Sequence, residues 1–259
     1  MIDITISLVS CNQRHDLAKL LPSLIPAANA VKAEILLVDN ASVDGTAEYV
    51  MKNYPEVSIL SNPIRTGYGE NHNLNLRRAR GRGYFVIMNS DMRVEPEIFT
   101  RLQRYMEEHA DVGIISPRIL NEDGSIQGLN KQFPTLFDLF LRRFLPKRLE
   151  RFFQKRLAYY EMRDVGYEHV CDVPFLSGAF MFCRADILRR LKGFDPDYFL
   201  YFEDADLCRR VQRTNRTVYY PYVSVTHFWA RSAHKNWIFT YHFIKSSLRY
   251  FGRWGYKLF

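Results

Sequence analysis

The sequence predicts an α/β protein whose central sheet is mostly parallel and is covered by helices on both faces. Short apolar runs alternate with segments of helical hydrophobic spacing in the first half of the chain, which is the order of repeated strand–helix–strand units. Nearly every position of these runs is apolar, as expected for strands buried on both faces. The runs cover residues 4–9, 34–38, 57–60 and 84–88.

Helices are expected between these strands. Residues 16–28 carry leucines at helical intervals, and Pro22 is expected to kink or shift that helix. A turn and N-cap at 44–46 precede the next helix. Residues 65–73 are rich in Gly and Asn, so we expect a loop there, followed by a short basic helix near 74–80.

The second half has a less regular pattern. A hairpin turn is expected at 121–124. The expected strands are 112–119, 177–182 and 219–226, and the expected helices are 185–191, 203–213 and about 235–250. No repeat or clear linker interrupts the chain, so we expect one domain over 1–259. Within it we distinguish a first half (1–120), a second half (121–230), a basic aromatic insertion (133–160) and a basic helical tail (231–259).

The net charge of +8 is concentrated in two segments. Residues 131–160 hold eight Lys/Arg and two acids, and residues 227–259 hold six Lys/Arg and no acid, so each segment carries +6. The rest of the chain is therefore at −4 (8 − 12). This distribution favours an anionic surface as a partner of these two segments.

Targeting and redox signals favour a cytoplasmic protein. No run approaches the roughly 20 apolar residues of a membrane-spanning helix, and the start of the chain lacks the basic region of a signal peptide. The four cysteines are scattered without a metal or redox spacing, so we expect buried free thiols: Cys11, Cys171, Cys183 and Cys208.

Polar residues follow three of the expected strands, at 10–12, 39–45 and 89–91. In open α/β sheets, ligands bind beyond the carboxyl ends of the strands. Asp91 there is either a ligand of Mg²⁺ or Mn²⁺ or a turn and cap residue. Asp39 either accepts a hydrogen bond from the ring N–H of uracil, thymine or guanine, or supports the turn.

A second group of acids opens the expected helix at 203–213. Glu203, Asp204 and Asp206 at a helix N-terminus are explained by the helix dipole alone. The preceding aromatic run would also place them beside an apolar wall, which raises a carboxylate pKa toward that of a general base. His227, after a strand, is either a metal ligand or a structural group.

Two common nucleotide-binding classes lose their main support. Gly67-Tyr68-Gly69 lacks the glycine spacing of the dinucleotide fingerprint, and no phosphate-binding P-loop is present. Ordinary kinases, NTPases and dehydrogenases are therefore disfavoured.

The ordered set of motifs resembles glycosyltransferase family 2 and, within it, the bacterial rhamnosyltransferase-like branch. The resemblance covers nearly the whole chain. It rests on residues 8–12, 38–46, 62–71, 88–91, 177–184, 193–195 and 201–210, with His227 at the place of a late metal-ligating histidine. One departure concerns the metal motif, whose first position is Asn89 and not Asp, so that Asp91 must carry most of the coordination.

The resemblance implies a GT-A fold, a first half that binds a nucleotide sugar, and an acceptor-binding second half. It implies Asp204 as catalytic base with Glu203 beside it, Gly178 and Asp206 on the acceptor side, and Asp91 with His227 as ligands of Mn²⁺ or Mg²⁺. The implied nucleotide-sugar residues are Ser10, Asn12, Asp39, Asn40, Ser42, Asp44, Asn62, Gly67, Asn71, Asn89 and Ser90.

The implied activity is inverting transfer of rhamnose or another hexose from a dTDP, UDP or GDP donor. The acceptor would be a glycan or polyprenyl-linked glycan in cell-surface polysaccharide synthesis. We expect the insertion 133–160 either to touch the inner face of the cell membrane peripherally or to pack on the domain. The alternatives are a nucleotidyltransferase, which lacks its basic Gly-rich loop here, and a nucleic-acid-binding protein, for which no motif is present.

Overall fold

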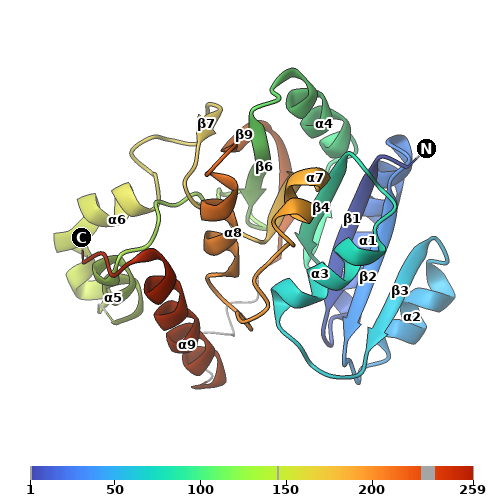
Figure 1. Ribbon diagram of the computed structural model, residues 1–259, viewed down its shortest axis with the longest axis horizontal. Helices are drawn as coiled ribbons and strands as arrows, with labels where there is room; N and C mark the ends of the chain where they lie inside the picture. Colours follow the sequence, from blue (N-terminus) through green and yellow to red (C-terminus); the bar gives the residue numbers. More distant parts are fainter. Residues whose placement is uncertain (1, 145, 229–236, 259) are drawn as a thin grey trace.

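The computed structural model describes residues 2–144, 146–228 and 237–258 (Figure 1). The first residues of the expected tail, 231–236, lie outside these ranges.

A mixed sheet crosses the whole molecule. Within the described residues it has nine strands in the order β3-β2-β1-β4-β8-β6-β9-β5, and β7 pairs with β9. Its parallel part consists of β1 (Ile4–Ser10), β2 (Glu34–Asn40), β3 (Val57–Asn62) and β4 (Tyr84–Asn89). The apolar runs of the sequence therefore form these four strands, as predicted.

The second part of the sheet continues from β4 through antiparallel β8 (Phe180–Arg184) to β6 (Val112–Leu120). β6 then pairs in parallel with β9 (Arg216–His227). Two strands that the sequence did not indicate, β5 (Met92–Val94) and β7 (Cys171–Asp172), pair antiparallel with β9. The central α/β sheet was thus predicted correctly, with six of these nine strands running in one direction.

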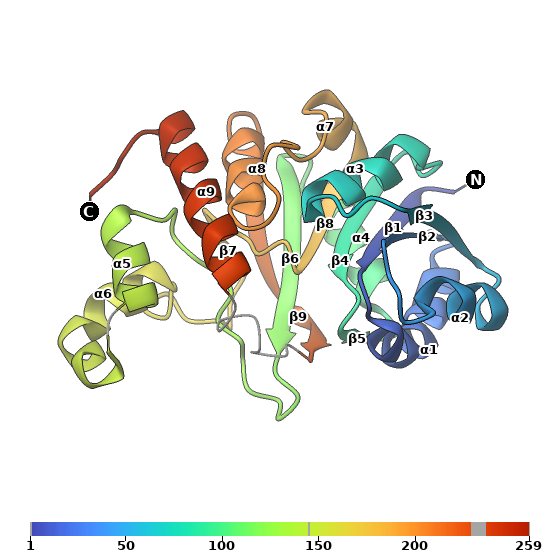
Figure 2. The same ribbon diagram turned by 90° about the horizontal axis from the view of Figure 1, so that it is seen from below.

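Helices cover both faces of the sheet, so the chain has two apolar cores (Figure 2). On one face lie α1 (Arg14–Ala30), α2 (Thr46–Asn53) and α4 (Ile98–Glu108). The opposite face holds α3 (Tyr68–Arg78), α7 (Ala185–Arg190), α8 (Glu203–Val211) and α9 (Trp237–Trp254). Cys183 and Cys208 are buried in this second core, and all four cysteines are free thiols.

The structure corrects two local predictions. α1 runs through Pro22 and Pro26 as one helix. Both prolines lie on its exposed side, where water can satisfy the freed carbonyl groups, while its leucines are buried. α3 begins at Tyr68 and not near 74, because buried tertiary hydrogen bonds hold its polar first turns, such as Asn73 Nδ2 to the carbonyl of Phe194 at 2.9 Å.

The insertion folds into α5 (Leu136–Phe144), the 3₁₀ helix η1 (Lys147–Phe153) and α6 (Gln154–Tyr160). Together with the end of α9 they form the end of the molecule farthest from β3 and α2 (Figures 1 and 2). Asp138 is buried and pairs with Arg156 at 2.6 Å, so this segment packs on itself. Phe152 nevertheless remains 66% exposed.

None of the described helices is both long and apolar enough to cross a membrane.

Candidate active site

Four parallel strands end at one edge and bring distant polar residues together. Ser10 lies opposite Asp39 in the register of β1 and β2. Asp39 Oδ1 and the hydroxyls of Ser10 and Ser90 are buried and make no hydrogen bond within the described residues. Because buried polar groups are normally satisfied, these three atoms mark a place where a polar ligand fits.

An asparagine network shapes the loop beside this edge. Asn40 Nδ2 donates to the carbonyl of Thr66 at 2.9 Å, and the Thr66 amide donates to Asn40 Oδ1 at 3.0 Å. Asn62 Nδ2 donates to Thr66 Oγ1 at 2.9 Å and to Asn71 Oδ1 at 3.1 Å. Asn71 is buried and its Nδ2 donates to the carbonyl of Gly67 at 2.8 Å, so it holds the loop, and its contact with a nucleotide stays a prediction.

The glycine at the end of this loop allows a close contact with the second half of the chain. A Cβ on Gly67 would lie 2.7 Å from the carbonyl oxygen of Tyr198 and 2.8 Å from Phe199 Cα. The Tyr68 amide also donates to the carbonyl of Phe199 at 2.9 Å. Gly67 therefore joins the loop to the segment that precedes α8.

The turns after β1 and β2 hold each other. The Asn12 amide donates to Ser42 Oγ at 2.9 Å, and the Val43 amide donates to Asn12 Oδ1 at 2.7 Å. Asp44 accepts hydrogen bonds from the amides of Arg14 and Thr46, both at 3.1 Å. Asp44 is thereby engaged at the starts of α1 and α2.

Asp91 and His227 come together although they are far apart in sequence. The β5–β9 ladder sets Met92 opposite His227, and His227 Nε2 lies 3.2 Å from Asp91 Oδ1. Gln127 donates to the His227 carbonyl through Nε2, so its Oε1 accepts from His227 Nδ1 at 2.9 Å. In the neutral ring, Nε2 then carries a lone pair directed toward the same region as Asp91 Oδ1, which makes no hydrogen bond within the described residues.

Two acceptors so close together suit a cation. Aspartate oxygen and neutral imidazole nitrogen are both ligands of Mn²⁺. The described part of the chain contains no group of three or more His, Cys, Asp or Glu that could hold a metal. A cation held by this pair would need its remaining ligands from the phosphate oxygens of a substrate and from water.

A chain of contacts connects this pair to the helix α8. Asn89 Nδ2 lies 3.2 Å from His227 Nε2, and Asn89 Oδ1 lies 3.0 Å from the Tyr68 hydroxyl. The same hydroxyl is 2.8 Å from the carbonyl oxygen of Gly178. The Gly178 amide donates to Asp204 Oδ2 at 2.9 Å, so Asn89, Tyr68 and Gly178 link Asp204 to His227.

Glu203 and Asp204 differ in environment. Burial raises the pKa of Asp204, against the Gly178 hydrogen bond and the positive charge of Lys131, which lower it. Glu203 is 5% exposed, and its burial together with the charge of Asp204 raises its pKa well above the ordinary value. Of the two carboxyl groups, Glu203 therefore has the more strongly raised pKa, and Asp204 stays the predicted base.

The backbone before α8 is strained. Tyr201 and Phe202 are consecutive non-glycine residues with φ of 71° and 67°. Left-handed conformations at such residues cost about 1–2 kcal/mol each and gather at functional sites. Here they turn the chain so that Glu203 and Asp204 open the helix beside Gly178.

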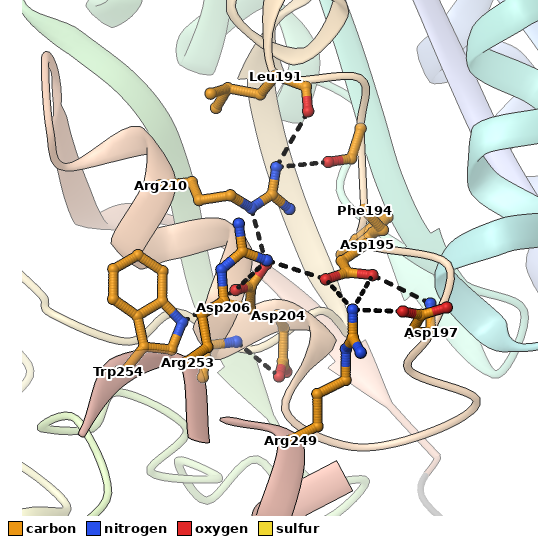
Figure 3. Close-up of polar contacts among 12 residues, drawn as sticks. Leu191, Phe194, Asp195, Asp197, Asp204, Asp206, Arg210, Arg249, Arg253 and Trp254 are labelled. Atoms are coloured by element: carbon orange, nitrogen blue, oxygen red, sulfur yellow. Dashed lines mark hydrogen bonds and ion pairs between the residues drawn. The ribbon is translucent and has the colours of Figure 1, made fainter. Parts of the chain in front are cut away.

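Asp206 lies in the interior, although we expected it on the acceptor side. It has no exposed surface and pairs with Arg210 at 2.7 Å, while Trp254 Nε1 donates to its Oδ1 at 2.9 Å (Figure 3). A side chain enclosed in this way cannot contact an acceptor. Asp206 therefore fixes α8 against α9 and positions Asp204.

Three residues of the candidate site were not predicted from the sequence. Tyr68 was noted only as part of a glycine-rich loop, and its position in the contact chain depends on residues 21 and 110 positions away. Gln127, which orients His227, follows a hairpin turn without any local signal. Lys131 lies close enough to Asp204 to change its pKa, but the sequence shows it only as one of many basic residues.

The comparisons with known proteins agree with this geometry. Residues 5–191 match the family model described as Glycosyl transferase family 2, and the chain belongs to that family. It is 29% identical over 214 residues to the N-acetylglucosaminyl-diphospho-decaprenol L-rhamnosyltransferase of Mycobacterium tuberculosis, covering 76% of this chain and 67% of that protein.

Solved structures share the fold. The mannosyltransferase PcManGT from Pyrobaculum calidifontis, in complex with GDP-Man and Mn²⁺, matches with a TM-score of 0.66 at 18% identity, over 95% of this chain and 63% of that one. GalNAc-T7 with UDP, GalNAc and Mn²⁺ matches with a TM-score of 0.65 at 15% identity, over 90% of this chain and 44% of that one. The fold is that of GT-A glycosyltransferases, and the chain spans only part of the length of these relatives.

Family membership favours the glycosyltransferase interpretation over the nucleotidyltransferase and nucleic-acid-binding alternatives. The predicted α/β fold and the family are thereby confirmed. The roles of individual site residues stay predictions.

Proposed function

We propose that this protein transfers a sugar, with inversion, from a nucleoside-diphosphate donor to a hydroxyl of a lipid-linked glycan in cell-surface polysaccharide synthesis. The observation that carries the proposal is the continuous set of contacts from Asp91 and His227, through Asn89, Tyr68 and Gly178, to Asp204. It sets a candidate site for a metal and a diphosphate opposite a candidate base.

The donor would lie along the carboxyl edge of β1 to β4. Asp39, buried with a free oxygen, would accept a hydrogen bond from the ring N–H of uracil, thymine or guanine. Adenine and cytosine offer no such ring N–H and would bind more weakly. Ser10, Asn12, Ser42 and Ser90 would supply further polar contacts to the nucleotide sugar.

A divalent cation, Mn²⁺ or Mg²⁺, fits Asp91 and His227 and would stabilise the negative charge that develops on the departing diphosphate. Asn89 would hold Tyr68 in place, and its amide, 3.2 Å from His227 Nε2, would have to turn away from that nitrogen for the metal to bind there. The two Mn²⁺ complexes among the structural relatives support this choice of cation.

Asp204 would take the proton from the acceptor hydroxyl as its oxygen attacks the anomeric carbon. The bond between that carbon and the diphosphate oxygen breaks on the opposite side, so the configuration inverts. The Gly178 amide would hold the carboxylate in position. A general base of this kind contributes about 10²–10⁴ in rate.

The relative from M. tuberculosis supports rhamnose as the sugar and a polyprenyl-diphosphate-linked N-acetylglucosamine as the acceptor. A thymidine diphosphate donor is therefore the first to test. A lipid-linked acceptor also favours peripheral contact with the inner face of a membrane, to which the exposed cations of η1 and α6 would contribute.

The first test is thermal stabilisation by dTDP, UDP, GDP, ADP and CDP, each with Mn²⁺, Mg²⁺ or chelator. A ligand at 100 times its dissociation constant adds about 2.7 kcal/mol of stability. We expect metal-dependent stabilisation by at least one of the first three. Stabilisation by none of the five would remove the donor site and the catalytic assignments with it.

The second test is Asp204→Asn. We expect the rate of sugar transfer to fall by at least about 10²-fold. Thermal stabilisation by the nucleotide should be unchanged, because in this proposal Asp204 does not contact the nucleobase of the donor. Near-normal transfer by Asp204→Asn would rule Asp204 out as the base.

A further inference from the structure

The helix α9 has apolar side chains on two opposite sides. Tyr250 and Phe251 on its inner side are buried in the domain. On its outer side, four large side chains recur at intervals of four, three and four residues, and together we call them the α9 stripe. The α9 stripe consists of Trp237, Tyr241, Ile244 and Leu248, which are 76%, 54%, 49% and 58% exposed.

The charges around the α9 stripe are positive. Residues 227–259 contain no acid, and Lys245 and Lys257 are exposed. Arg249 and Arg253, in contrast, pair with Asp195 at 2.9 Å and belong to the inner side. At the same end of the molecule η1 adds exposed Arg148 and Arg151.

This combination fits a lipid surface better than a second protein copy. Trp and Tyr prefer the boundary between apolar chains and water, and lysines beside them attract anionic head groups. Two copies that paired through this stripe would bring their lysines together without any acid from the same segment to neutralise them.

We propose that α9 lies in the interface of an anionic membrane, with the α9 stripe inserted among the lipids. The inference deepens the proposed function, because it names the element that brings the enzyme to a lipid-linked acceptor. It goes beyond the contact expected for the insertion 133–160, which would only add cations at the edge of the same surface.

The inner side of α9 connects this surface to the catalytic helix. Trp254 Nε1 donates to Asp206, and Arg209 Nε of α8 donates to the Tyr250 hydroxyl at 2.7 Å. Figure 3 shows Arg249 and Arg253 reaching the loop around Asp195. A membrane that orients α9 therefore also sets the height of Asp204 above the lipid, which would favour membrane-bound acceptors over dissolved ones.

The test compares two double variants in vesicle sedimentation. Tyr241→Ser/Leu248→Ser removes half of the stripe. Met51→Ser/Tyr222→Ser is the matched control, because its side chains are 57% and 53% exposed on other elements. Vesicles of phosphatidylglycerol and phosphatidylcholine, and of phosphatidylcholine alone, are used with the whole chain.

We expect the wild type and the control to sediment with the anionic vesicles, and the stripe variant to bind at least tenfold more weakly. Lys245→Glu should weaken binding to anionic vesicles only. Equal sedimentation of stripe and control variants would overturn the proposal. The proposal would also be overturned if the wild type did not bind vesicles and instead formed a dimer through the stripe. Such a dimer would be recognised because the stripe variant would be a monomer.

Two further measurements separate this inference from the proposed function. Unchanged thermal midpoints and unchanged nucleotide stabilisation show that the stripe variant is folded with an intact donor site. The stripe variant should also have a raised KM for a vesicle-bound lipid-diphosphate acceptor but not for a water-soluble acceptor. Stripe-dependent vesicle binding without any sugar transfer by the wild type would reject the proposed function and leave this inference standing.

Discussion

Neighbouring groups change the pKa values of single residues at the candidate site. Asp204 is held by the Gly178 amide on one side and by its own helix on the other, where the Ala205 amide donates to it at 2.9 Å. Lys131 is half-buried beside this group, and burial lowers its pKa to about 8, with the charge of Arg142 acting in the same direction. The ammonium of Lys131 and the carboxylate of Asp204 therefore stabilise each other's charged forms.

This environment predicts the pH dependence of transfer. Burial raises the pKa of Asp204 above its ordinary value of 3.8, and a base works only when it is ionised. The rate should therefore fall as the pH decreases through that raised pKa. Lys131→Met removes a charge that lowers the pKa of Asp204, so it should shift this acid limb to higher pH.

The measurement is the pH profile of kcat/KM for the wild type, Lys131→Met and the control Lys52→Met, whose side chain is exposed on α2. Of the two methionine variants, only Lys131→Met should shift the acid limb of the pH profile. Lys131→Arg, which keeps the positive charge, should leave the acid limb at its wild-type pH. An acid limb that is the same in all four proteins would contradict the role of Lys131.

At the scale of elements, the contacts between α8, α9 and the loop at Asp195 hold the second half together. Asp195 accepts hydrogen bonds from both Arg249 and Arg253. Its burial favours the neutral acid, but the hydrogen bond from Arg249 and the two positive charges outweigh burial and lower its pKa. An aspartate with a lowered pKa stabilises the folded protein only when it is ionised.

The sign of this contribution gives a prediction for Asp195→Asn. The stabilisation by Asp195 is present above the unfolded pKa near 3.8 and is lost as the pH falls through the lower folded pKa. At pH 7 the variant should lose about 1 kcal/mol of unfolding free energy, because Arg249 is partly exposed and its charge is screened.

Urea unfolding of wild type and variant at pH 7 and below 3.8 provides the measurement. The difference between the two proteins should shrink in acid. Asp197→Asn is a useful control, because Asp197 is 63% exposed and pairs with the same Arg249. A difference that is independent of pH would mean that the side-chain charge of Asp195 is not what stabilises this loop.

The elements also show what the sequence could predict. Strands such as β1 were predictable because each is a short apolar run, and the local pattern carries that information. The start of α3 was not, since Asn73, in the part of the helix that was missed, is buried through hydrogen bonds to and from the distant Phe194 backbone. Burial of polar residues by tertiary partners leaves no periodic signal.

The site was predictable in part for the same reason. Asp91 was singled out because it follows an apolar strand, and His227 only through the resemblance to the family. Their contact depends on the pairing of β5 with β9, and β5 has only three residues, too few for a pattern. Asp206 was misplaced because its spacing from Asp204 did not reveal that Arg210 and Trp254 enclose it.

At the scale of the whole molecule, the sheet separates two tasks. Its parallel part ends in the turns that would bind the donor, and the strands β8, β6 and β9 form the half of the sheet next to Gly178, Asp204 and His227. The two parts meet where the Tyr68 amide bonds to Phe199 and the Tyr68 hydroxyl to Gly178. Donor binding should therefore suppress local opening mainly in the parallel part and at this junction.

Hydrogen exchange can test this division. We expect the nucleotide that binds (dTDP, UDP or GDP), added with Mn²⁺, to slow amide exchange in three turns and the adjoining loop. The amides of these segments lie at the proposed donor edge, and a bound ligand suppresses local opening. The segments are 10–14, 39–46, 62–68 and 89–92. Phe228, whose amide donates to the carbonyl of Asp91 at 2.8 Å, should be slowed only when the metal is present.

The outer end of the molecule provides the internal control. Helices α5 and α6 lie at the end opposite β3 and α2, so their amides should exchange at the same rate with and without the nucleotide. Uniform slowing over the whole chain would instead indicate that the ligand raises global stability and that the two parts open together. Slowing confined to α5 and α6 would place the nucleotide away from the carboxyl edge and contradict the proposed donor site.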